Sequence, residues 1–178
     1  VAFQGSNGNW PDGTPASITD NKGWFGSAKM VSSQPVLAVV NDAMLTQSYG
    51  TVTSAAYNAA TSADGATKVF APLARRRHTN SALTTGLQVQ NIGSVPTDIT
   101  VTYKTSTGAA AGSEKITGVA AGASVNVYQD GATSPFPVGT FGSAVITSSG
   151  APITLIVNDF SLPGASNELD AAIYNGLK

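Results

Sequence analysis

The chain has 178 residues, of which 42% are hydrophobic and only 11% are charged, with 19 glycines, 9 prolines and no cysteine. This length and apolar content suffice for one or two domains with a core, and they exclude a disordered chain, a collagen and a coiled coil. Nine basic against ten acidic residues give a net charge of −1. Since a nucleic-acid partner requires a basic surface, we expect no nucleic-acid binding.

The sequence also limits where the protein resides. Its longest apolar runs are far shorter than the roughly 20 residues of a membrane helix, so we expect no membrane span. Without cysteine there are no disulfides and no thiolate metal ligands. Ser, Thr, Asn and Gly fill positions where a cytosolic protein more often carries Lys and Glu. We therefore expect a secreted protein, extracellular or at the cell surface.

Taken in chain order, the pattern indicates strands and turns. The nearly continuous apolar runs 36–40 (VLAVV) and 153–157 (ITLIV) predict central strands covered on both faces. Between them, 87–92 (LQVQNI) and 99–104 (ITVTYK) alternate apolar and polar residues, which predicts two half-buried strands around a turn. Segments 41–49 and 55–60 are too short for independent helices. The predicted fold class is all-β and antiparallel.

An internal repeat is the most informative feature. Its copies keep the apolar character at strand positions and differ in loop length, as duplicated units do. The matched segments, the later copy lying 116 or 117 residues downstream, are 25–33 (FGSAKMVSS) with 141–149 (FGSAVITSS), 34–42 (QPVLAVVND) with 151–159 (APITLIVND), and 55–58 (AAYN) with 172–175 (AIYN). Residues 1–4 (VAFQ) extend the match to 126–129 (NVYQ) at a spacing of 125.

The repeat predicts the domain organisation. Residues 1–57 correspond to the second half of a sandwich unit, whereas 58–178 form one complete unit, because 58–128 has no counterpart. A sheet must bury its apolar face against another layer. We therefore expect the extra half to be covered by an intramolecular neighbour, by a symmetry mate, or by the remainder of a longer polypeptide.

A resemblance to a known family rests on three segments. Residues 86–94 (GLQVQNIGS), 97–103 (TDITVTY) and 118–125 (GVAAGASV) resemble the immunoglobulin-like sandwich repeats of secreted bacterial surface proteins, including cell-adhesion-related domains. The resemblance implies antiparallel Ig-like β-sandwich units and a role in a stalk, in adhesion or in surface assembly. It carries over no catalytic residue.

The search for chemistry gives no candidate catalytic residue, no metal site and no cofactor motif. His78 is the single histidine, and the sequence contains no Gly-x-Ser-x-Gly nucleophile turn. The carboxylates are scattered and form no calcium-loop motif. Asn-Asp recurs at 41–42 and 158–159, directly after the two continuous apolar runs, and we interpret both pairs as Asx turns that end the strands. We expect a protein that is not an enzyme.

Two groups of residues are candidates for weak partner contacts. Arg75, Arg76, Arg77 and His78 concentrate charge in a charge-poor chain; the alternatives are a solvated loop and a contact with an anionic partner. Trp10, Trp24 and Phe25 accompany a long loop. Such rings either anchor a subunit interface or stack on glycans.

These expectations combine into one functional hypothesis. We expect an extracellular structural protein, a homo-oligomer or polymer that assembles through shared sandwich halves or strand addition into a filament, surface layer or adhesive stalk. The alternative is a carbohydrate-binding module of a secreted enzyme.

Overall fold

The computed structural model describes residues 27–46, 50–80, 82–162 and 171–178. Within these residues the chain forms β-strands and one short 3₁₀-helix, η1, and no α-helix, so the prediction of an all-β chain is confirmed. Every strand pairing found here is antiparallel. The elements are β1 Val39–Thr46, β2 Gly50–Asn58, η1 Ser62–Asp64, β3 Lys68–Arg76, β4 Leu83–Asn91, β5 Thr97–Thr105, β6 Ala110–Val119, β7 Ser124–Tyr128, β8 Thr140–Ser148, β9 Ile153–Ser161 and β10 Ala171–Asn175.

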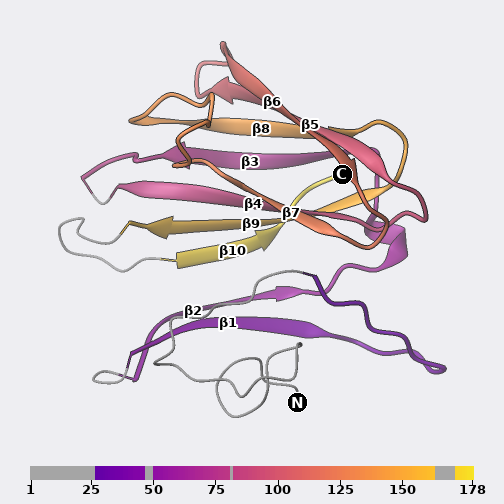
Figure 1. The fold of residues 1–178 in the computed structure, drawn as a ribbon. Coiled ribbons are helices and arrows are strands. Elements are labelled where there is room, and N and C mark those ends of the chain that lie inside the picture. The colour runs from indigo at the N-terminus through magenta and orange to yellow at the C-terminus, as the bar shows by residue number, and fades with distance from the viewer. Residues whose placement is uncertain (1–26, 47–49, 81, 163–170) are drawn as a thin grey trace.

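The strands form three sheets (Figure 1). One four-stranded sheet has the order β10-β9-β4-β7, and the other has the order β3-β8-β5-β6. The remaining strands, β1 and β2, pair only with each other among the described residues. Figure 1 shows this pair beside β10, which agrees with the contacts between β2 and β10. The fold is therefore a sandwich-like body with an additional hairpin at one side.

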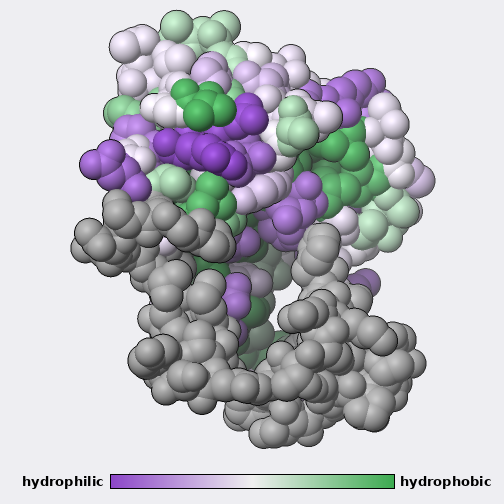
Figure 2. All heavy atoms as spheres, turned by 60° about the vertical axis from the view of Figure 1, so that its left-hand side comes forward, coloured by the Kyte–Doolittle hydropathy of each residue, from purple (hydrophilic) through white to green (hydrophobic). Residues whose placement is uncertain are grey.

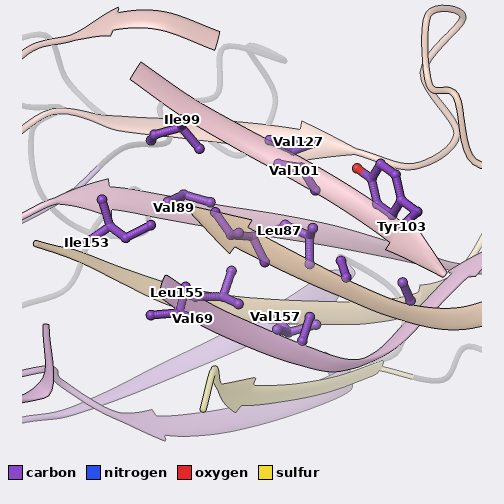
Figure 3. Packing of buried hydrophobic residues seen from close by; sticks show 14 of the residues in the cluster. Val69, Leu87, Val89, Ile99, Val101, Tyr103, Val127, Ile153, Leu155 and Val157 are labelled. Carbon is purple, nitrogen blue, oxygen red and sulfur yellow. The ribbon is translucent and has the colours of Figure 1, made fainter. Parts of the chain in front are cut away.

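The core lies between the two four-stranded sheets. Figure 3 shows Leu87, Val89 and Val157 from the first sheet near Val101 and Tyr103 from the second. All five side chains are fully buried. The alternation read in the sequence explains this, because every second residue of a strand faces the same side. In β5 the residues at 97, 99, 101 and 103 are buried, and those between them are partly or fully exposed.

The predicted strands agree with the fold in three of four places. Segments 87–92 and 99–104 fall almost wholly in β4 and β5. Segment 153–157 lies in β9, which is central because β10 and β4 flank it. Segment 36–40 differs, since β1 begins only at Val39 and pairs with a single strand of the described chain. The prediction of a central strand at 36–40 was therefore wrong for the described part of the structure.

Hydrophobic side chains also reach the surface. In the view of Figure 2, hydrophobic patches lie next to strongly hydrophilic ones. Several of the exposed large hydrophobic residues fall in the first part of the described chain: Met30, Val31, Val36, Leu37, Val39 and Val40. Single exposed hydrophobic residues are common, but a run of them within eleven positions marks a surface that another layer would cover.

Candidate functional site

The two hairpins β1–β2 and β9–β10 have the same register. Val40 lies opposite Tyr57, and 117 residues later Val157 lies opposite Tyr174. Each of the five residue pairs of β9–β10 has its counterpart in β1–β2 at this spacing. The backbone repeats as well: the amide of Ala59 donates to the carbonyl of Ala38 at 3.0 Å, and that of Gly176 donates to Leu155 at 2.8 Å.

The two hairpins differ in how far their side chains are buried. Ile153 and Val157 are 0% exposed, whereas their counterparts Val36 and Val40 are 60% and 37% exposed. The preceding segment differs too. Residues 141–149 lie mostly in β8, whereas the described part of its counterpart, 27–33, forms no strand and is largely exposed. Residues 27–42 therefore present, uncovered within the described structure, a surface whose counterpart is buried in the sandwich.

Strand β4 covers the second hairpin. It pairs with the edge of β9 that faces away from β10, with Leu87 opposite Val157 and Val89 opposite Leu155. These positions of β9 correspond to Val40 on β1 and to Ala38, the residue just before β1. Since β1 pairs with β2 alone among the described residues, its other edge has no equivalent of β4 there.

A polar network joins β9 to both β3 and β4 within the sandwich. The buried carboxylate of Asp159 accepts a hydrogen bond from the Thr85 hydroxyl at 3.1 Å and forms an ion pair with Arg75 at 3.3 Å. Thr85 also lies opposite Asp159 in the strand register. The Thr85 hydroxyl accepts in turn from the Arg75 backbone amide at 2.9 Å. Polar groups in an apolar interior require hydrogen-bond partners, and Arg75, Thr85 and Asp159 provide them for one another.

The network corrects the interpretation of the recurring Asn-Asp pairs. Strand β1 continues past Asp42 to Thr46, and β9 continues past Asp159 to Ser161, so neither pair ends a strand. Asp159 serves instead as a buried acceptor that locks β9 to its neighbours. The repeated aspartate after an apolar run was the sequence signal for this role, but its partners Arg75 and Thr85 have no counterpart in the repeat and gave no signal.

Tyr57 and Tyr174, which occupy equivalent positions in the two hairpins, also differ in their contacts. The Tyr174 hydroxyl donates to the carbonyl of Leu73 on β3 at 3.0 Å. Burial raises the pKa of Tyr174, and the charge of Asp159 contributes in the same direction. Burial also raises the pKa of Tyr57, with the charge of Asp42 as the second cause. Each tyrosine thus lies near the aspartate of its own hairpin, and within the described residues it is Tyr174 that bonds to β3.

The predicted contact residues Arg75 to His78 all have partners within the chain. Arg76 donates to the backbone carbonyls of Ser134 at 2.8 Å, Phe136 at 2.7 Å and Gly131 at 3.2 Å. Arg77 forms a two-point ion pair with Asp130, with bonds of 2.6 and 2.9 Å. The His78 ring lies 4.7 Å from that of Phe141. The guanidinium groups thus hold the 130–136 loop against the end of β3, and partner binding by these residues stays a prediction.

The other predicted contact residues, Trp10, Trp24 and Phe25, lie outside the described residues. Among those described, no three His, Cys, Asp or Glu side chains are placed to hold a metal ion. No helix in the same residues is long and apolar enough to cross a membrane.

A cleft of about 640 Å³ lies where the chain leaving β2 meets the C-terminal residues. Asn58, Asp64, Thr154 and Asn175 contribute polar groups to its wall. Asp64 is already engaged, since it accepts from the backbone and the hydroxyl of Thr61 at 2.8 and 2.7 Å. The described lining residues include no aromatic ring on which a sugar would stack.

Comparisons with known proteins leave the family open. No protein-family model matches the sequence, and no curated protein does. Among solved structures, the crystal structure of Thermotoga maritima 1070 is similar at a TM-score of 0.49 and 15% sequence identity, covering 64% of this chain and 94% of the other. A likeness of this strength supports no conclusion about fold family or function.

Proposed function

We propose that the protein is a structural building block of an extracellular assembly, in which residues 27–46 and 50–58, named the 27–58 surface, join one sandwich unit to another. The observation that carries this proposal is the pair of hairpins with one register and opposite burial. The hairpin β9–β10 is covered by β4, whereas the equivalent hairpin β1–β2 is uncovered among the described residues. The hairpin β1–β2 is therefore one half of a unit, and another unit would supply the other half.

The energetics favour association over exposure. Fully burying one valine side chain contributes roughly 1.5–3 kcal/mol. Val31, Val36, Leu37 and Val39 are each more than half exposed, so covering this segment yields several such contributions. The chain's net charge of −1 adds little repulsion between like copies.

The unit in this proposal is an Ig-like sandwich repeat. The two four-stranded antiparallel sheets around one core are consistent with it. The repeat spacing of 117 residues also suits a sandwich of this size. A polar surface rich in Ser, Thr and Asn suits an extracellular filament, surface layer or stalk, whose work is mechanical rather than catalytic.

Self-association of the purified chain tests this function. We expect the apparent mass in size-exclusion chromatography with light scattering to rise with concentration, because copies cover the 27–58 surface on one another. The double substitution Val36→Lys and Val40→Lys places charges on that surface and should leave a monomer.

Val95 and Val138 supply a matched control. They are 57% and 62% exposed and lie in connections of the sandwich-like body, so Val95→Lys with Val138→Lys adds the same charge elsewhere. This control should associate like the unmodified chain. A chain that stays monomeric at all concentrations, or equal loss in both double variants, contradicts the proposal.

A further inference from the structure

The partner of the uncovered hairpin is specified by what covers its counterpart. At the spacing of 117 residues, three positions of β1–β2 correspond to positions with known partners in the sandwich. Val40 corresponds to Val157, which faces Leu87 across the strand pair. Asp42 and Tyr57 correspond to Asp159 and Tyr174, whose partners come from β3 and β4.

Asp42 supplies the charge for recognition. Its counterpart Asp159 is 8% exposed and binds Arg75 and Thr85, whereas Asp42 is exposed and forms no ion pair with any described residue. A carboxylate among apolar neighbours selects a partner that brings a cation, since burying it unpaired is costly. The missing layer should therefore carry an arginine at the place of Arg75 and a hydroxyl at the place of Thr85.

Tyr57 adds a second polar requirement on the other strand of the hairpin. Its counterpart Tyr174 donates to the Leu73 carbonyl of β3, two residues before Arg75. Two consecutive strands, β3 and β4, one in each four-stranded sheet, thus supply every partner: a carbonyl for the tyrosine, an arginine and a threonine for the aspartate, and Leu87 for the valine.

A folded copy of this chain cannot lend its own β4, because β9 and β7 already pair with both edges of that strand. The partner strands must come from a unit in which the place of β9–β10 is open. We propose that residues 36–46 and 50–58 dock an arginine-bearing pair of consecutive strands with the side-chain pattern of β3 and β4, supplied by a further sandwich unit. This inference rests on the proposed function and names the partner of its surface.

The register of the docked strand that corresponds to β4 follows from the repeat. Leu87 of the incoming strand should lie opposite Val40, Thr85 opposite Asp42, and Val89 opposite Ala38, as they do against Val157, Asp159 and Leu155. This arrangement is strand addition, in which backbone hydrogen bonds supply affinity and alternate side chains supply specificity.

A synthetic peptide of residues 66–92, which spans β3 and β4, serves as the probe and is titrated into the full chain by calorimetry. We expect one peptide to bind per chain. The peptide with Arg75→Gln should bind about tenfold more weakly or worse, because it leaves Asp42 buried without its cation. The peptide with Arg77→Gln loses the same charge at a position that faces Asp130 in the sandwich, and it should bind like the unmodified peptide.

Substitutions in the full chain, combined with those in the peptide, complete a double-mutant cycle. Asp42→Asn should weaken binding of the unmodified peptide about as much as Arg75→Gln does, with little further loss when the two are combined. Asp98→Asn removes an equal charge from an exposed ion pair with Lys115, which joins β5 to β6. This variant should leave peptide binding unchanged. Absence of peptide binding overturns the inference, as does equal weakening by Arg75→Gln and Arg77→Gln, or binding that Asp42→Asn leaves intact.

The outcome is separable from that of the proposed function. Copies that associate while the peptide fails to bind would support assembly and show that a second copy's own 27–58 surface is the occupant. A peptide that binds as described to a chain that never self-associates would support the proposed partner strands and contradict self-assembly.

Discussion

The side-chain amide of Asn175 donates a hydrogen bond to the backbone carbonyl of Asn58 at 2.9 Å, and these two residues occupy the same position in the two hairpins. Asn58 pairs with Val39, and Asn175 pairs with Ile156, 117 residues later. The ends of equivalent strands thus meet directly.

Removing this contact should loosen the hairpin β1–β2 and leave the sandwich unaffected. We expect Asn175→Ala to lower the free energy of unfolding by about 1 kcal/mol or less, because the bond is exposed to solvent. Hydrogen exchange at the end of β2 should accelerate. Asn126→Ala, at an exposed position of β7, is the control and should leave exchange in β2 unchanged.

The buried Asp159 should be far more sensitive than any surface carboxylate. Asp159→Asn removes the charge that Arg75 and Thr85 share, and we expect a loss of about 2–4 kcal/mol in urea unfolding. Asp98→Asn breaks the more exposed pair with Lys115 and should cost less than about 1 kcal/mol. Equal losses in the two variants would contradict the role of Asp159 as the lock between β9, β3 and β4.

A close backbone approach makes Gly142 a test of the β8–β5 pairing. A β-carbon at this residue would overlap the backbone carbonyl of Lys104 on the neighbouring strand, where no side chain can move aside. We expect Gly142→Ala to destabilise the protein by about 3 kcal/mol or more, or to prevent folding. Gly150→Ala faces open space and should stay within about 0.5 kcal/mol of the unmodified chain in thermal melts.

Acid should weaken the link between Arg77 and Asp130. The hydrogen bond from Arg77 holds the pKa of Asp130 below its usual value. A carboxyl whose pKa is lower in the folded than in the unfolded chain stabilises the fold above the unfolded value, near 4, and loses that contribution as the pH falls through the folded value.

We therefore expect stability to decline on acidification below about pH 4, and Asp130→Asn to decline less steeply over the same range. Urea unfolding from pH 6 down to pH 2 gives both curves. Asp98 shares the direction of shift through Lys115 and Gly118, so the slope that persists in Asp130→Asn should shrink again in the double variant with Asp98→Asn. Parallel curves for the unmodified chain and Asp130→Asn would contradict this account.

Local sequence pattern determined the secondary structure. Alternation at 99–104 and the continuous run at 153–157 identified β5 and β9, because the side chains of a strand face opposite sides in turn and a central strand is covered on both. The run at 36–40 is likewise almost continuously apolar, but it lacks a covering strand in the described structure. The composition of a strand shows which of its side chains could be buried, whereas the neighbouring strands determine which of them are buried.

The sequence by itself also determined the repeat, since matching residues at 116 and 117 positions require no coordinates to be seen. Only the tertiary structure decided that the matched hairpins share a register, that Asp159 is bound by Arg75 and Thr85, and that Val36 and Val40 are exposed where Ile153 and Val157 are buried. The physical reason is that these facts depend on strands far apart in the chain. Burial and ion pairing belong to the pair of elements in contact, and neither element contains that information alone.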